Sequence, residues 1–171
     1  MSKGKVVAVV CCAAILALMM FISNPTAKTI DQFIMYYNRE IENTAKDRNV
    51  SAADCLLKNV QHNSILYGTE AKKEFFSGKI AFLGNDYKEA LSLGFAFDES
   101  VSSEVIFSVI EAAILASGED YDKVARSLGI LSGDKYSIRG GDEKVTTFNG
   151  KKYSVHWVDV DKIFFVIEFE K

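Results

Sequence analysis

Histidine supplies the general acid or base in many enzymes, and this chain has two, His62 and His156. Strand alternation in the run from Tyr153 to Trp157 places Ser154 and His156 on one sheet face, a pairing that suggests a hydrolase. Residues two apart on a strand are separated by about 6 to 7 Å, however, and the chain has no Gly-x-Ser-x-Gly turn to expose a nucleophile. Neither histidine has a zinc ligand at a typical spacing. We therefore predict no catalytic residue and expect His156 to be a half-exposed sheet residue.

Acidic residues gather at two places where they could coordinate a cation. They are Glu119, Asp120, Asp122, Asp159 and Asp161. Aspartate favours turns and helix starts because its side chain accepts hydrogen bonds from nearby backbone N–H groups. Neither group is followed by the glycine and closing glutamate of an EF-hand loop. Turn formation explains these residues, so we predict no bound metal and no cofactor.

The overall charge bears on the kind of partner. The chain has 20 basic and 23 acidic residues, which gives a net charge of −3. Affinity for nucleic acid comes largely from lysine and arginine side chains that neutralise phosphates. We therefore expect no nucleic-acid partner and favour another protein.

Aromatic residues near the predicted turns are candidates for a protein-binding face. The four that we single out are Tyr136, Phe148, Tyr153 and Trp157. Lysines flank them, among them Lys151 and Lys152. An exposed apolar patch with a polar rim is typical of a protein-binding surface.

One cysteine lies outside the apolar N-terminal region. Cys11 and Cys12 lie within that region, which leaves Cys55 without a partner for an internal disulfide. Two roles stay open for it. It is either a buried and inert thiol, which the usual burial of free cysteine favours, or the site of a bridge to another chain in an oxidising compartment.

The N-terminal region has the pattern of a membrane segment. Lys3 and Lys5 precede an uncharged apolar run, residues 6–22, which reaches the lower limit for spanning a hydrocarbon core of about 30 Å. A soluble helix would show a polar stripe, and this run has none. Because basic residues stay on the cytoplasmic side, we expect the rest of the chain to lie outside, in the periplasm or the extracellular space. The residues that we expect to lie within the membrane include Val6, Val10, Ile15, Leu18 and Ile22.

The same run could be a cleaved secretory signal, after which the protein would be secreted. Cleavage needs small residues at the first and third positions before the cut. A cut after Ala27 would place Pro25 at the third position, and a cut after Ser23 would place Phe21 there. We therefore favour a retained, single-pass anchor with its N-terminus in the cytoplasm.

Apolar spacing predicts four helices in the remainder of the chain. Thr29 and Gln32 form a capping box at the start of the first, which extends to about residue 47. A short helix is predicted over 52–59. A third, over 104–117, is apolar except for a narrow polar stripe and ends at Gly118, and a fourth covers 120–128.

Strand patterns follow each pair of helices, so the order helix, strands, helix, strands suggests two halves. Strands are predicted over 64–69, 75–83 and 89–97, and the third has one bulky face and one flat face that would let a helix approach. Asn149 and Gly150 predict a two-residue hairpin turn between 145–148 and 151–158. A last strand covers 162–170.

Together these patterns predict an α+β protein. We expect an N-terminal membrane segment and linker, residues 1–27, followed by a single extracytoplasmic domain, residues 28–171, with helices packed on a mainly antiparallel sheet of about five to six strands. With no catalytic constellation in view, the favoured function is a membrane-tethered or exported binding module of the inhibitor, immunity or assembly type. The alternatives are an extracytoplasmic hydrolase that uses dispersed carboxylates, and a purely structural subunit.

Overall fold

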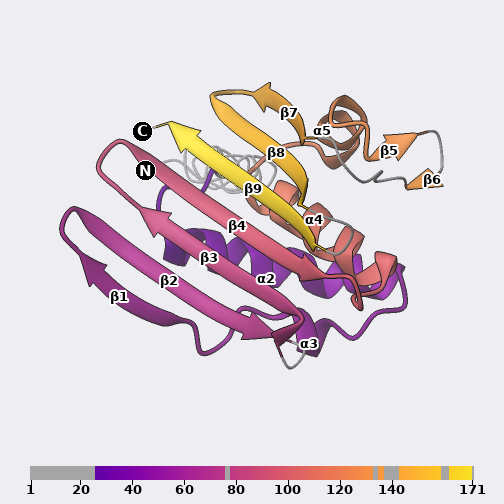
Figure 1. The fold of residues 1–171 in the computed structure, drawn as a ribbon, viewed down its shortest axis with the longest axis horizontal. Helices are drawn as coiled ribbons and strands as arrows, with labels where there is room; N and C mark the ends of the chain where they lie inside the picture. Colours follow the sequence, from indigo (N-terminus) through magenta and orange to yellow (C-terminus); the bar gives the residue numbers. More distant parts are fainter. Residues whose placement is uncertain (1–25, 76–77, 133–134, 137–142, 159–161, 171) are drawn as a thin grey trace, which may run out of the picture.

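The computed structural model describes residues 26–75, 78–132, 135–136, 143–158 and 162–170, which form one α+β domain (Figure 1). The predicted membrane segment, residues 6–22, lies outside these ranges. Within them, no helix is both long enough and apolar enough to cross a bilayer.

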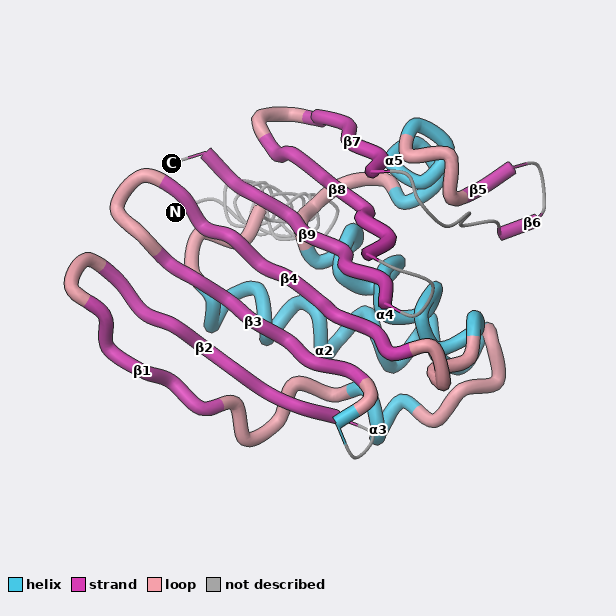
Figure 2. The backbone as a smooth tube through the Cα atoms, in the orientation of Figure 1, coloured by secondary structure: helices cyan, strands magenta, loops and turns pink. Residues whose placement is uncertain are grey.

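Helices and a seven-stranded antiparallel sheet form two layers, with the helices on one side of the sheet (Figure 2). The helices are α2 (Ile30–Asp47), α3 (Ala52–Cys55), α4 (Ser103–Ala116) and α5 (Tyr121–Ser127). The large sheet has the order β1-β2-β3-β4-β9-β8-β7. Its strands are β1 (Gln61–Ile65), β2 (Gly68–Phe75), β3 (Ile80–Asp86), β4 (Ala90–Asp98), β7 (Glu143–Phe148), β8 (Lys151–Val158) and β9 (Lys162–Glu170). A separate pair consists of β5 (Leu131–Ser132) and β6 (Lys135–Tyr136).

The chain passes twice from a pair of helices to an antiparallel meander, as its helix–strand order predicts. Helices α2 and α3 precede the meander β1–β4, and helices α4 and α5 precede the meander β7–β9. The last strand of each meander lies at the centre of the sheet, where β4 and β9 pair antiparallel with Phe95 opposite Phe165. The two halves thus share one continuous sheet and one core.

Bulky side chains on the inner face of the sheet form that core with α2 and α4. In β4 the buried residues are Leu91, Leu93, Phe95 and Phe97, each about 1% exposed. The ring of Tyr37 on α2 stacks on that of Phe95 with 5.3 Å between centroids. The helices therefore pack on the bulky face, and the expectation that the flat face receives a helix is wrong. Large rings fill the space between the layers and bury more apolar area than alanine and glycine would.

Helix α2 begins and packs as its sequence predicts. The Thr29 hydroxyl accepts a hydrogen bond from the Gln32 backbone N–H (3.2 Å), while the Gln32 side chain accepts one from the Lys28 N–H, one residue before the cap. Its buried face is formed by Ile30, Phe33, Tyr37 and Ile41.

The narrow polar stripe of α4 faces α2. The Thr44 hydroxyl donates to the Ser108 carbonyl (3.1 Å), and the Ser108 hydroxyl donates to the Glu104 carbonyl (2.7 Å). Arg48 and Glu111 form an ion pair one turn further on. Ser108 and Glu111 of α4 thus meet Thr44 of α2 and Arg48 at its C-terminal end, and most of the remaining residues of α4 are buried, as its apolar composition predicts.

The sheet has seven strands where five to six were expected. The strand predicted over 64–69 is a hairpin, β1–β2, that turns at residues 66–67, and the strand predicted over 75–83 is interrupted by a turn with Gly78 at φ +89°. Strand β1 is an exposed edge, so it has no apolar alternation by which it could be recognised. The β7–β8 hairpin is confirmed, with φ of 47° at Asn149 and 74° at Gly150.

Candidate partner-binding surface

The outer face of the sheet, turned away from the helices, has an apolar centre. We call this surface the open face. Strand pairing places Leu83, Gly94 and Val166 in one row across β3, β4 and β9, and Ala81, Ala96 and Phe164 in the next. In Figures 1 and 2, α2 and α4 lie behind the sheet, and no described helix crosses the front of it. Leu83 is 40% exposed.

Charged side chains on both flanks of the open face pair with one another. Lys72 lies 3.0 Å from Glu70 on the β2 side, and Lys152 lies 3.0 Å from Glu168 on the β8 side. The hydrogen bond from Lys72 lowers the pKa of Glu70, and the hydrogen bond to Glu168 raises the pKa of Lys152. These flanks therefore carry balanced charge, so they present no strong field to a highly charged ligand.

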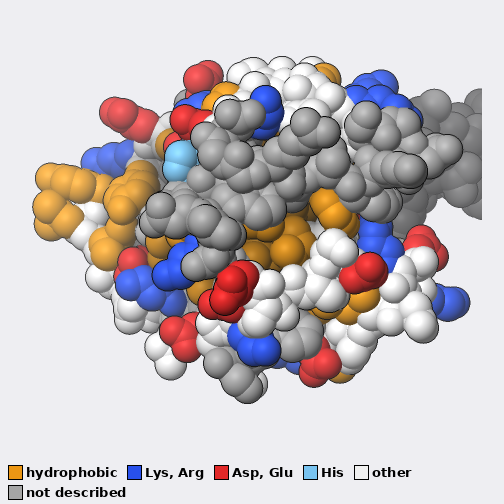
Figure 3. Space-filling view, turned by 45° about the vertical axis from the view of Figure 1, so that its right-hand side comes forward, with side chains coloured by type: hydrophobic (Ala, Val, Ile, Leu, Met, Phe, Trp, Pro, Cys, Tyr) orange, Lys and Arg blue, Asp and Glu red, His pale blue; other side chains and the backbone are white. Residues whose placement is uncertain are grey.

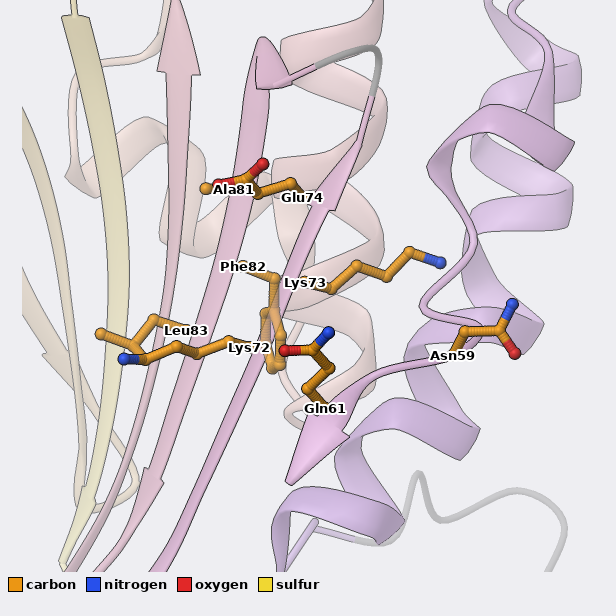
Figure 4. Close-up of a pocket in the computed structure, with 8 residues that line it drawn as sticks. All are labelled: Asn59, Gln61, Lys72, Lys73, Glu74, Ala81, Phe82 and Leu83. Carbon is orange, nitrogen blue, oxygen red and sulfur yellow. The ribbon is translucent and has the colours of Figure 1, made fainter. Parts of the chain in front are cut away.

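An open groove of about 780 Å³ runs along the sheet edge beside this face. In Figure 4, Lys72 and Leu83 extend to one side of the strands and Lys73 extends to the other. The Lys73 ammonium donates to the Leu56 carbonyl (3.1 Å) and to the Lys58 carbonyl, and burial lowers its pKa. Lys73 thus links the segment between α3 and β1 to strand β2 through hydrogen bonds. The polar side chains of the groove therefore diverge, and Lys72 and Leu83 lie on the side of the open face.

An acidic groove of about 530 Å³ lies between α4 and α5. Three of its four carboxylates have structural partners: Glu111 pairs with Arg48, Glu119 binds Lys151, and Asp120 caps α5 by accepting from the Lys123 N–H (3.1 Å). Burial raises the pKa of Glu111, although the Arg48 charge opposes this.

No metal site forms among the acidic residues that the structure describes. In that part of the chain, no group of three or more histidine, cysteine, aspartate or glutamate side chains could hold an ion. Asp159 and Asp161 lie outside it.

Of the four aromatic residues predicted to form a binding face, the structure describes the side chains of Phe148 and Tyr153. Tyr153 is fully buried, which corrects its assignment to an exposed face: it lies on the inner side of β8 with Val155, where the helices cover it. Phe148 is half-buried against the core. The side chains of Tyr136 and Trp157 lie outside the described part of the structure.

His156 is exposed on the open face and lies opposite Phe164 in the strand register, so it is a sheet residue, as expected.

The apolar residues of the open face are absent from the residues that the sequence analysis predicts for a binding face. A signal for them was present in β9, where the run from Ile163 to Ile167 is apolar at every position and not only at alternate ones.

The Tyr153 hydroxyl has a structural role that gives a testable prediction. It shares a buried hydrogen bond of 2.6 Å with the Ser117 hydroxyl at the end of α4, and burial raises its pKa. We expect Tyr153→Phe to lower the free energy of unfolding by about 1 kcal/mol, the usual net contribution of such a bond. Urea denaturation followed by circular dichroism measures this. Tyr67→Phe, at an exposed turn, is the matched control, and equal stability of all three proteins would contradict the assigned role.

Cys55 is a core residue, which agrees with the first of its two predicted roles, a buried and inert thiol. It is 1% exposed, and burial raises the pKa of its thiol to about 12. The Tyr37 hydroxyl donates to the Cys55 carbonyl (3.1 Å). The thiol is therefore not accessible to another chain while the domain is folded.

Comparisons of the chain with protein-family models, with curated proteins and with solved structures find no match. Arguments about function therefore depend on the surfaces described above.

Proposed function

We propose that this chain is a membrane-tethered or exported binding module, of the inhibitor, immunity or assembly type, that docks a partner protein on the open face. The proposal places the domain on the outer side of a membrane, tethered by the apolar run of residues 6–22. The observation that carries the binding role is the apolar centre of the open face.

A sheet face that only meets water is usually polar. Antiparallel sheets commonly alternate apolar residues toward the core with polar residues toward solvent. Strand β4 departs from this with Gly94 and Ala96 on its outer side, and β9 does so with Phe164 and Val166. A contiguous apolar area with a polar rim favours a protein partner.

The form and charge of the open face indicate what kind of partner it suits. Small residues at the centre, Gly94 and Ala96, leave the backbone close to the surface, while Leu83 and Phe164 project beside them. The flanking charges are already paired with one another. The complementary surface is therefore an apolar, nearly uncharged area of another protein, and not a polyanion.

Photo-crosslinking in membranes tests this proposal with the full-length chain. A benzophenone amino acid replaces Phe164, and a control chain carries it at Met35, which is 59% exposed on α2. We expect a discrete protein adduct from position 164 that is lost when Val166→Glu is added. No adduct from position 164, or the same adduct from position 35, would contradict docking on the open face.

The location is tested separately by fractionation. The full-length chain is expected to stay in the membrane fraction after extraction with alkaline carbonate, and a chain that lacks residues 1–25 is expected to leave it. External protease should degrade the domain in intact cells whose outer surface is accessible. Recovery of the unprocessed, full-length chain from the cytosol without detergent would contradict the tether.

A further inference from the structure

Two neighbouring hairpin turns form an exposed apolar cluster at one end of the sheet. Leu66 and Tyr67 in the β1–β2 turn are 84% and 62% exposed, and Tyr87 in the β3–β4 turn is 45% exposed. The Lys88 ammonium lies over the Tyr67 ring, 5.3 Å from its centroid. We call these four residues the turn cluster. Figure 3 shows hydrophobic side chains projecting at the left-hand end of the molecule, where the two turns lie in Figure 1.

The turn cluster has a composition that turn formation does not require. Two-residue hairpin turns favour asparagine and glycine, as at Asn149 and Gly150 in this chain. Leucine and tyrosine at 66 and 67 lose that conformational advantage and expose apolar area to water. Turn formation therefore gives no reason for leucine and tyrosine at these two positions.

The two turns are held firmly side by side. A Cβ atom on Gly68 would lie 1.4 Å from the Asp86 backbone carbonyl oxygen, so the backbones touch at this point. Thr69 also pairs with Asp86 in the strand register. The turn cluster is thus a fixed feature of the folded sheet.

The part of the chain that the structure describes begins at the same end of the sheet. Ala27 is buried, and Ile30 in the first turn of α2 lies near Gly84, close to the β3–β4 turn. Figure 1 shows the start of the described chain, the two turns and the end of β9 at this end. The strand register agrees, because Glu170 pairs with Ala90.

A short connection joins this end to the apolar run. From Ile22, the last residue of that run, to the buried Ala27 is five residue steps, which span at most about 18 Å when fully extended. A tether of this length holds the nearby end of the domain close to the lipid headgroups.

We propose that the turn cluster contacts the headgroup region of the membrane in which residues 6–22 are anchored. This inference rests on the proposed tether. Tyrosine is enriched at membrane interfaces, where its ring meets the apolar side and its hydroxyl meets water, and lysine extends its ammonium toward phosphates. Leu66 supplies the apolar side chain that enters the boundary. With this end against the lipid, the open face points sideways and remains accessible to a partner.

Depth-dependent fluorescence quenching tests the proposal on the full-length chain in phosphatidylcholine vesicles. Cys11, Cys12 and Cys55 are replaced by alanine, and circular dichroism checks that the fold is retained. One new cysteine at position 66 carries a polarity-sensitive fluorophore, and a matched chain carries it at position 35. We expect a blue-shifted emission at 66 and at least twofold stronger quenching by headgroup-level nitroxide lipids than at 35.

Flotation of the same vesicles separates the two proposals. A chain that floats with the vesicles but is quenched equally at 66 and 35 overturns the contact of the turn cluster and leaves the tether standing. A chain that does not float overturns the tether, and with it this inference. A chain that floats and shows quenching confined to 66 supports both.

Discussion

Replacing Phe165 with alanine is expected to lower the free energy of unfolding by about 3 to 5 kcal/mol, while the same change at Phe164 should cost about 1 kcal/mol or less. Phe165 is fully buried beneath the helices and opposite Phe95 at the centre of the sheet. Phe164 is half-buried on the open face. Because the two residues are identical and adjacent, local strand propensity is matched and only the face differs.

Urea denaturation of the full-length chain in detergent, followed by circular dichroism, measures both free energies. A benzophenone amino acid at Leu83 or Val166 can report the crosslink to a partner when position 164 is changed. The Phe164→Ala chain is expected to lose this crosslink, because the variant removes the largest apolar side chain of the open face. Equal losses of stability at 164 and 165 would mean that the outer side of β9 is covered as deeply as the inner side. That result would contradict an accessible open face.

The layer structure of the domain could be predicted because alternation in the central strands is strong. In β4 the sequence separates bulky from small residues at every step, and the structure buries the bulky set. Periodicity divides a strand into two faces without saying which face a helix covers. That choice depends on the volume between the layers, which rings such as Phe82 and Phe95 fill together with Phe33 and Tyr37.

The first hairpin could not be predicted because its strand and turn lack the usual signals. Strand β1 is exposed along nearly its whole length, so no apolar period distinguishes it from a loop. Its turn contains Leu66 and Tyr67 and neither asparagine nor glycine. The close contact of Gly68 with Asp86 is a long-range feature that one sequence does not reveal.

The prediction that Tyr153 lies on an exposed face is wrong for a related reason. Tyr153 lies near a turn, but nearness to a turn does not by itself expose a side chain. Tyr153 and Val155 are two residues apart in β8, so their side chains lie on the same face of the sheet, and both are buried. Alternation along the strand predicts the burial of Tyr153 better than its distance from a turn does, because a one-residue step moves a side chain to the other face of the sheet.

Glu119→Ala is expected to lower the free energy of unfolding by about 3 kcal/mol, the lower end of the range for breaking a buried ion pair. Glu119 follows α4 and accepts hydrogen bonds from Lys151 (2.5 Å) and Asn149 (2.9 and 3.1 Å). The side chains of Glu119 and Lys151 are only 10% and 6% exposed. Removing the carboxylate leaves the Lys151 ammonium on the inner side of the sheet with its main countercharge gone.

The neighbouring pair of Lys152 and Glu168 provides the matched control, since it has the same two ionic groups, 3.0 Å apart, with 52% and 46% of the side chains exposed. Glu168→Ala should leave the urea midpoint unchanged within error, because exposed pairs contribute little. Adding Lys151→Met to Glu119→Ala should recover much of the lost stability, since it removes the uncompensated buried charge. If Glu119→Ala and Glu168→Ala gave the same small change, the buried pair would not be what joins the β7–β8 hairpin to the end of α4.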